Sequence, residues 1–359
     1  MGGALNLGTF AGIPVKVHWT FGLLLLFVVY TAFSNGLKTS QSIGFILYIL
    51  ILFLCVVLHE FGHALTARKY GVTTRDIVLS PIGGLARLES MPEKPFHEFH
   101  ISIAGPLVNL AIGAVLGIGL LLFTGNLWPD WDDFMFDQPV EFMRYIWFMN
   151  MALFVFNLIP AFPMDGGRIL RSLLSVRLGR VRATRIASTI GRAFAIGFVI
   201  FGVFNQQLVL SLIGLFIFMM AGAENNQTRV AALLGNVTAA DIMRTEFTRL
   251  HLSDTYSTII EKYYREGEHN FLVFDSMGNL SGSIPELFIK DVLKENKVDL
   301  TAQQLMSPVM TLTDPGEPLK DVIEKMRNDG AGIVGVTSGG RIIGVLDRHN
   351  IEDYIRLRS

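Results

Sequence analysis

A long apolar run that ends in ionisable side chains is the strongest constraint on the fold of this chain. Residues 43–58 carry no charged side chain, and His59-Glu60-Phe61-Gly62-His63 continues the same segment. Such a run is typical of a membrane-spanning helix, which needs about 20 apolar residues. Burying Glu and His at membrane depth is costly, so ionisable residues there are functional by default. A pair of polar residues exposed at a helix end is the simpler alternative.

The spacing of the two histidines favours a metal site. His59 and His63 are four residues apart, so on a helix one face offers both imidazoles to a single zinc ion. Glu60 lies beside them and can act as a base on water that the metal activates. We therefore predict a metal site on this segment.

The composition indicates a polytopic α-helical membrane protein with the lipid bilayer as its surroundings. Of the 359 residues, 51% are hydrophobic and only 17% are charged. A net charge of −1 gives no support to a nucleic-acid partner. About six transmembrane helices are predicted. They cover residues 17–33, 43–67, 101–123, 145–160, 186–204 and 208–223.

Loop charges orient these predicted spans. Basic residues follow the second and fourth spans, whereas residues 128–141 hold acidic side chains and no basic one. The positive-inside rule places the basic loops in the cytosol. With six spans, both termini are then cytosolic, and we expect the plasma membrane of a prokaryotic cell. The acidic residues of the opposite loop are Asp130, Asp132, Asp133, Asp137 and Glu141.

The C-terminal part reads as a soluble α/β module that contains a repeat. The segment that begins at Ile289 matches the one that begins at Ile351, and each unit reads as helix, short strands and helix. Such pairs usually bury their sheet faces against each other. The predicted boundaries are a transmembrane domain over residues 1–224, a linker over 225–236, and repeats over 237–296 and 297–359.

A third metal ligand is expected far along the chain, because catalytic zinc usually has three protein ligands. Pro160 and Pro163 interrupt the fourth span just before Asp165. Irregular backbone at membrane depth is tolerated where it is buried in protein or lines a watery cavity. A carboxylate there is a suitable ligand. The alternative is that Asp165 caps the helix that follows, over residues 166–175.

Taken together, these motifs resemble the site-2 protease family of intramembrane zinc metalloproteases. The resemblance rests on the HExxH segment, the NxxPxxPxDG segment over residues 157–166, the AGPxxN segment over 104–109 and the glycine-containing loop over 81–85. It covers about residues 10–224. The C-terminal repeat resembles a pair of CBS domains, which one subgroup of the family carries.

The resemblance implies a metalloendopeptidase that cuts a membrane-protein substrate in or near a transmembrane segment, as in regulated intramembrane proteolysis. It implies His59, His63 and Asp165 as ligands of one zinc ion and Glu60 as the general base. Asn157 would donate to the developing oxyanion. The alternative for Asn157 is a bond to the backbone that Pro160 frees.

The substrate must unwind, because a helical peptide bond has its amide and carbonyl hydrogen-bonded within the helix. The segment over residues 73–89, with Gly83 and Gly84, could present an edge to the unwound strand. A plain connecting loop is the alternative. Asn109 either contacts the substrate or ties two helices together.

The CBS resemblance implies an adenine nucleotide, but the expected polar residues differ. Asp347 stands where Ser or Thr is usual, and Asn350 replaces the usual Asp. Arg341 and Arg348 could still offer charge to phosphate. A docking or homodimerisation module without ligand is the alternative. A CBS-gated transporter or channel is the second function class, although that class leaves the HExxH segment without a role.

Overall fold

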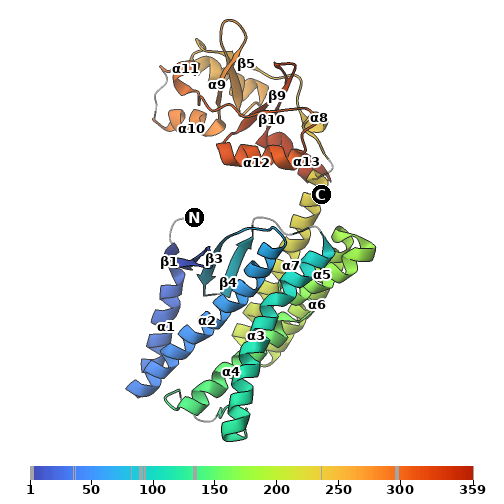
Figure 1. The fold of residues 1–359 in the computed structure, drawn as a ribbon. Coiled ribbons are helices and arrows are strands. Elements are labelled where there is room, and N and C mark those ends of the chain that lie inside the picture. Colours follow the sequence, from blue (N-terminus) through green and yellow to red (C-terminus); the bar gives the residue numbers. More distant parts are fainter. Residues whose placement is uncertain are drawn as a thin grey trace. The chain divides into compact units, whose positions relative to one another are not determined.

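The computed structural model describes residues 4–34, 36, 38–81, 83–88, 92, 94–131, 136–235, 237–295 and 299–358. It divides into two compact units, Met1–Asn226 and Gln227–Ser359. Figure 1 shows the first as a bundle of long helices with a small sheet near one end, and the second as a smaller α/β unit. This is the predicted fold class, a helical membrane protein followed by an α/β module.

Long helices dominate the first unit. Among the described residues they are α1 (Thr20–Ser34), α2 (Thr39–Lys69), α3 (Pro95–Thr124), α4 (Pro139–Asn157), α5 (Asp165–Leu178), α6 (Arg180–Phe204) and α7 (Leu208–Leu234). Helix α7 continues beyond Asn226 without interruption, so the connection to the second unit is helical.

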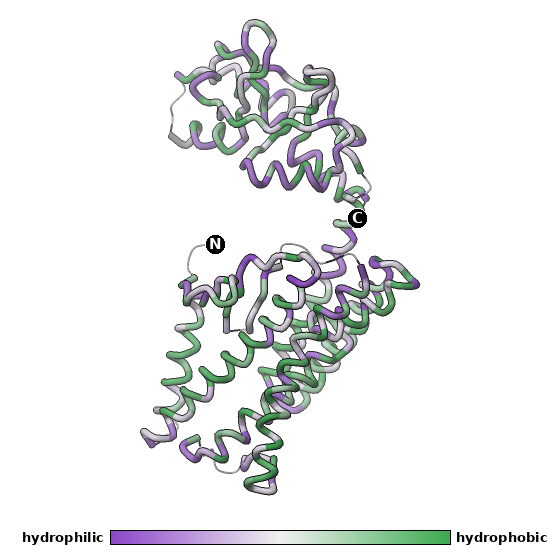
Figure 2. The backbone as a smooth tube through the Cα atoms, in the orientation of Figure 1, coloured by the Kyte–Doolittle hydropathy of each residue, from purple (hydrophilic) through white to green (hydrophobic). Residues whose placement is uncertain are grey.

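Four of the described helices, α2, α3, α6 and α7, are long and apolar enough to cross a membrane. α1 is a shorter apolar helix, and α4 has 19 residues, so the predicted number of six spans stays a prediction. Figure 2 shows hydrophobic residues along most of the length of these helices. Large apolar side chains point outward, with Leu122 78% and Phe123 90% exposed, as expected for a surface that faces lipid.

The predicted break between the last two spans is confirmed, because α6 ends at Phe204 and α7 begins at Leu208. The start of the first predicted span is wrong. Residues 17 and 18 belong to a strand, and α1 begins only at Thr20. In the acidic loop, Asp132 and Asp133 lie outside the described residues.

A four-stranded sheet accompanies the helices, and its first two strands were not predicted. The strands are β1 (Ala4–Phe10), β2 (Ile13–His18), β3 (Thr74–Ser80) and β4 (Gly83–Leu88), in the order β1-β2-β3-β4. β2 and β3 are parallel, and the other pairs are antiparallel. The alternation of Ile13, Val15 and Val17 with other residues was the available signal, since Ile13 and Val15 are buried.

One buried carboxylate joins three strands of this sheet. Asp76 of β3 is fully buried and accepts from Lys16 Nζ of β2 at 2.8 Å and from Arg87 Nε of β4 at 2.5 Å. The hydrogen bond from Arg87 lowers the pKa of Asp76, so the carboxylate stays ionised at neutral pH. The ion pair between Asp76 and Arg87 therefore links β4 to β3.

Small residues let the central helices approach closely. A Cβ atom at Gly62 of α2 would lie 2.7 Å from the carbonyl oxygen of Ala104 in α3. On another face of α3, a Cβ at Gly113 would collide with Met151 of α4. Small residues at such contacts are typical of helix packing in membranes. α3 therefore lies directly against the segment that carries His59 and His63.

The second unit has the predicted internal repeat. Its first half contains α8 (Ala239–Ile242), β5 (Arg249–His251), α9 (Tyr256–Glu266), β6 (Phe271–Phe274), β7 (Leu280–Ile284) and α10 (Glu286–Glu295). The second half repeats this order with α11 (Ala302–Leu305), β8 (Leu312–Thr313), α12 (Leu319–Asp329), β9 (Ile333–Ser338), β10 (Arg341–Asp347) and α13 (Arg348–Arg358). Each half forms a three-stranded sheet.

The two halves exchange their first helices. Ala239 of α8 lies in the core of the second half, and Ala302 of α11 lies in the core of the first half. A third cluster joins the two sheets through Leu272 of β6 and Ile333 of β9. The sheets are therefore packed on each other as expected, and neither half has a core made only from its own segment.

Candidate metal centre

The centre begins with two buried histidines on one face of α2. His59 and His63 are 7% and 5% exposed, and their rings meet edge to face with centroids 4.8 Å apart. They are one helical turn apart, so their side chains leave the helix in the same direction. The expected pairing of these two residues is present.

Hydrogen bonds behind the rings set which nitrogen faces the centre. His63 Nδ1 lies 2.7 Å from the carbonyl oxygen of Ile101 in α3, and a carbonyl only accepts, so Nδ1–H donates. His59 Nδ1 lies 3.2 Å from Asn109 Oδ1 on the same helix. With both Nδ1 atoms protonated, both Nε2 atoms carry a lone pair toward the centre.

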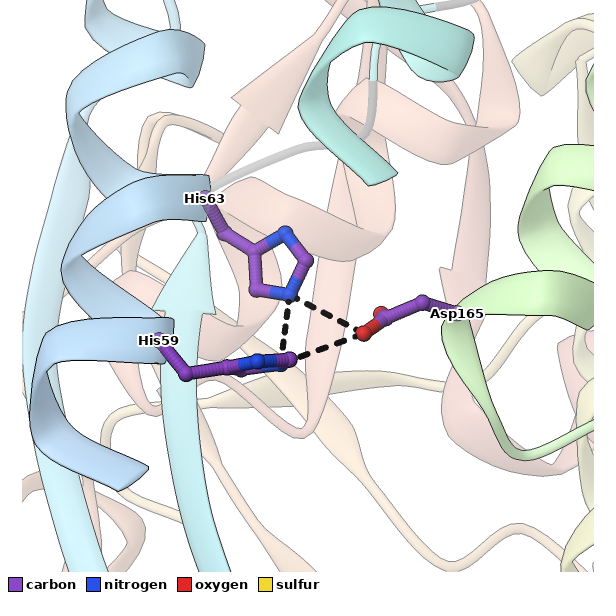
Figure 3. Close-up of side chains that lie close together, drawn as sticks. All are labelled: His59, His63 and Asp165. Carbon is purple, nitrogen blue, oxygen red and sulfur yellow. Dashed lines mark hydrogen bonds and ion pairs between the residues drawn. The ribbon is translucent and has the colours of Figure 1, made fainter. Parts of the chain in front are cut away.

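Asp165 completes a three-atom cluster. Its Oδ2 lies 3.2 Å from Nε2 of His59 and 3.2 Å from Nε2 of His63, and the two Nε2 atoms are 3.1 Å apart. Figure 3 shows the two imidazoles from α2 and the carboxylate from the start of α5 converging on one another. Three lone-pair atoms at this separation repel unless a cation or a proton lies among them.

The donor set fits zinc. A tetrahedral zinc ion with bonds of about 2.0–2.1 Å to nitrogen and oxygen holds neighbouring ligand atoms about 3.3 Å apart. The three separations in the cluster are 3.1–3.2 Å. Two imidazoles and one carboxylate form a known ligand set of catalytic zinc, which keeps a fourth position open.

The segment before α5 aims Asp165 at the histidines. α4 ends at Asn157, and the irregular stretch that contains Pro160 and Pro163 leads into Asp165, the first residue of α5. Met164 takes the position before the helix, and among the described residues the Asp165 carboxylate bonds to His59 and His63. The alternative role of Asp165 as a helix cap is therefore wrong.

Arg171 secures α5 to two other helices. Its side chain is 1% exposed and lies 4.9 Å from the ring centroid of Phe162. Its Nε donates to Glu98 of α3 at 2.7 Å, and its Nη1 donates to Glu224 of α7 at 2.5 Å. Removing one partner of a buried ion pair is strongly destabilising, so these bonds are expected to hold α5 against α3 and α7.

Gly105 of α3 forms the floor beneath the imidazoles. A Cβ atom at this position would lie 2.7 Å from His59 Nε2 and would collide with the ring of His63. The position belongs to the AGPxxN segment. Only glycine leaves both rings in place, so Gly105 is part of the centre although no pattern in the sequence indicates this role.

Glu60 points to the sheet. Its Oε2 accepts a hydrogen bond from the backbone N–H of Ala86 in β4 at 2.9 Å. A Cβ at Gly84 would lie 2.9 Å from Glu60 Cγ, so Gly84 lies against this side chain, whereas a Cβ at Gly83 would meet nothing. The segment predicted as an edge or a loop is thus a strand beside Glu60.

The two asparagines occupy different places. Asn109 is 1% exposed and bonds to His59, so its side chain lies behind the metal cluster and ties α3 to α2. Asn157 is half-buried at the end of α4. In the described part of the chain its side chain makes no hydrogen bond to the backbone near Pro160.

In the second unit, the two residues that the CBS resemblance assigns to nucleotide binding are hydrogen-bonded to an arginine of the same unit. Arg244 donates to Asp347 at 3.0 Å, to Asn350 at 3.1 Å and to Glu268 at 3.0 Å. Asp347 is also 3% exposed. The polar pair that the CBS resemblance singles out therefore binds an arginine of the same chain.

A further group of His and Glu residues lies in the second unit, but it is less compact than the cluster in the first unit, and its carboxylate already has other partners. His269, Glu286 and His349 lie near one another, with ligand atoms up to 4.8 Å apart. Glu286 already accepts from Lys290 Nζ at 2.7 Å and from the Tyr263 hydroxyl at 2.8 Å. The Lys290 ammonium opposes a second cation, and no ion is assigned here.

Known proteins similar to this chain include zinc metalloproteases that match it over nearly its whole length. The model of peptidase family M50 matches residues 47–140 and 130–198, and the CBS domain model matches residues 302–357. Zinc metalloprotease MJ0392 of Methanocaldococcus jannaschii is 31% identical over 348 residues, which is 97% of this chain and 95% of that protein. The Rip3 protein of Mycobacterium tuberculosis is 26% identical over 98% of this chain and 93% of its own length. A solved site-2 protease from M. jannaschii is 37% identical, covering 62% of this chain and 95% of that chain with a TM-score of 0.48.

Gly105→Ala tests the geometry of the cluster. The new methyl group would displace both imidazoles, so we expect zinc per chain to fall well below the wild-type value, while the helix itself is favoured by alanine. Gly119→Ala on the same helix is the matched control, because a Cβ there meets nothing within 4 Å. Metal analysis of the purified proteins is the measurement. Wild-type zinc content in a folded Gly105→Ala protein would contradict the proposed site.

Proposed function

The chain belongs to peptidase family M50, the site-2 protease type of membrane zinc metalloprotease, and on this premise we propose that it cuts a peptide bond in or near a transmembrane segment of a membrane protein. The observation that carries the proposal is the buried cluster of His59, His63 and Asp165 with Glu60 on the same helix turn. The enzyme class follows from the family, whereas the substrate and the regulated intramembrane proteolysis are our proposal.

His59, His63 and Asp165 would hold the zinc ion. Bound zinc supplies a Lewis acid that polarises a carbonyl and makes water nucleophilic at neutral pH. Asn109 and the carbonyl oxygen of Ile101 keep the two imidazoles in the tautomer that ligation needs.

Glu60 would act as the general base and Asn157 as the oxyanion donor. Glu60 takes a proton from the attacking water and can return it to the leaving amine. The side chain of Asn157 is half-buried, and among the described residues it makes no hydrogen bond to the proline-interrupted backbone next to it. A fixed N–H donor has its largest effect where negative charge develops in the transition state.

The substrate would bind as an extended strand beside β4. A transmembrane helix hides its peptide groups, so it must unwind before attack. Among the described residues β4 is the last strand of its sheet, so an extended peptide could pair along its outer edge. Gly83 and Gly84 keep side chains away from this start of the strand.

The second unit would regulate or dock rather than depend on a nucleotide. Arg244 already neutralises Asp347, so adenine nucleotide would have to compete with an internal ion pair. This favours docking or homodimerisation over nucleotide sensing. The protein would lie in the plasma membrane of a prokaryotic cell. Its second unit and both termini would lie on the cytosolic side.

Glu60→Gln tests the mechanism. The base is lost while both histidines remain, so cleavage of a single-span peptide with a central Asn-Gly pair should fall about 100- to 10,000-fold at unchanged zinc content. Glu352→Gln, an exposed carboxylate in α13, should behave as wild type. Cleavage by reconstituted protein is the assay. Normal cleavage by Glu60→Gln would rule out Glu60 as the base.

Cysteine labelling tests the orientation. Cysteines introduced at Asp132 and Ser338 of a Cys55→Ala protein should react with an impermeant maleimide from opposite sides of the membrane, because the acidic loop and the second unit are proposed to lie on opposite sides. The Cys55→Ala protein alone should stay unlabelled. Labelling of both positions from one side would overturn the six-span arrangement.

A further inference from the structure

Among the described residues one edge of β4 carries no strand partner, and Glu60 of α2 reaches this edge. Within the described residues β4 pairs only with β3, through partners such as Ile77 with Ala86 and Leu79 with Gly84. In an antiparallel pair, successive residues turn their N–H groups alternately toward the partner and away from it. The N–H of Ala86 is bonded to a side chain of α2, so it belongs to the outer row.

The acceptor of that outer N–H is the proposed base itself. Glu60 Oε2 lies 2.9 Å from the nitrogen of Ala86. Gly84, two residues earlier in the strand, lies against Glu60 Cγ. Glu60 therefore occupies the place on the strand edge where the carbonyl of an added strand would bind.

We propose that Glu60 and a backbone carbonyl of the substrate accept a hydrogen bond from the Ala86 N–H in turn. Before substrate arrives, this N–H holds the carboxylate against the strand. A substrate segment that pairs with β4 takes the N–H with its own backbone carbonyl, and Glu60 is then released to accept the proton of the attacking water. The inference rests on the proposed function, because it requires a substrate strand at β4.

Because of this exchange, Glu60 is released as a base only when the substrate segment has unwound. A carboxylate accepts a stronger hydrogen bond than a neutral carbonyl does, so one substrate carbonyl does not displace Glu60 alone. The other bonds along β4 must form at the same time, and a segment that stays helical has no free carbonyls to make them. Cleavage is thereby confined to segments that extend over several residues.

Two inactive variants separate this exchange from catalysis. Glu60→Gln keeps an oxygen that can accept from the Ala86 N–H, whereas Glu60→Ala has none, and both are uncharged and leave the substrate intact. We expect the single-span Asn-Gly peptide to bind Glu60→Ala about two- to tenfold more tightly than Glu60→Gln, the change that corresponds to one net hydrogen bond. A blocked tetrapeptide, too short to pair along β4, should bind both equally.

Ala86→Pro completes a double-mutant cycle. This substitution removes the outward N–H and no bond between β3 and β4, and proline is tolerated on edge strands. In the Ala86→Pro background the difference between Glu60→Ala and Glu60→Gln should vanish. Binding is measured on full-length reconstituted protein whose zinc content has been verified. Equal binding to the two single variants, or a difference that persists with Ala86→Pro, would overturn the proposal.

The outcomes distinguish the two levels of the account. If wild-type protein does not cleave the single-span peptide, the proposed function fails. If it does cleave the peptide and the two Glu60 variants bind it equally, the exchange at Ala86 fails while the proposed function stands.

Discussion

Two imidazole nitrogens and one carboxylate oxygen approach one another to 3.1–3.2 Å inside the first unit, each with a lone pair toward the others. Such a group needs a cation or a proton among its three atoms, and much of the unit serves to assemble it. α2 supplies the histidines, and α3 supplies the acceptors behind them and the glycine beneath them. The ion pair between Arg171 and Glu98 holds α5, which brings Asp165, against α3. The sheet then meets the same helix turn through Glu60.

The residues proposed as zinc ligands could be singled out from the sequence because each lies in a local pattern. Two histidines four residues apart lie on one face of a helix. The prolines before Asp165 indicate an interruption of the helix, where a side chain can turn inward. What surrounds them was not predictable in this way. The Ile101 carbonyl is an ordinary backbone group, and Arg171 and Glu98 meet from positions 73 residues apart in the chain. Their roles depend on how α3 and α5 cross, which no local pattern contains.

The strands show the same limit. β3 and β4 were anticipated only as a segment that could present an edge, and β1 and β2 were missed because Val17 was assigned to the following apolar run. In the second unit the repeat was visible, but the exchange of α8 and α11 between the two cores was not, since each is a short helix with no distinctive pattern. The pairing of Arg244 with Asp347 joins residues 103 positions apart and changes the interpretation of the CBS resemblance.

The central claim is that zinc is held by two imidazoles and one carboxylate. Zinc K-edge X-ray absorption on the purified wild-type protein tests it most directly, because the fine structure counts imidazole rings and detects sulfur. The account predicts two imidazoles and a first shell made only of nitrogen and oxygen at about 2.0–2.1 Å. A shell with sulfur at about 2.3 Å, which only Cys55 or a methionine of this chain could supply, or with one or three imidazoles, would contradict it.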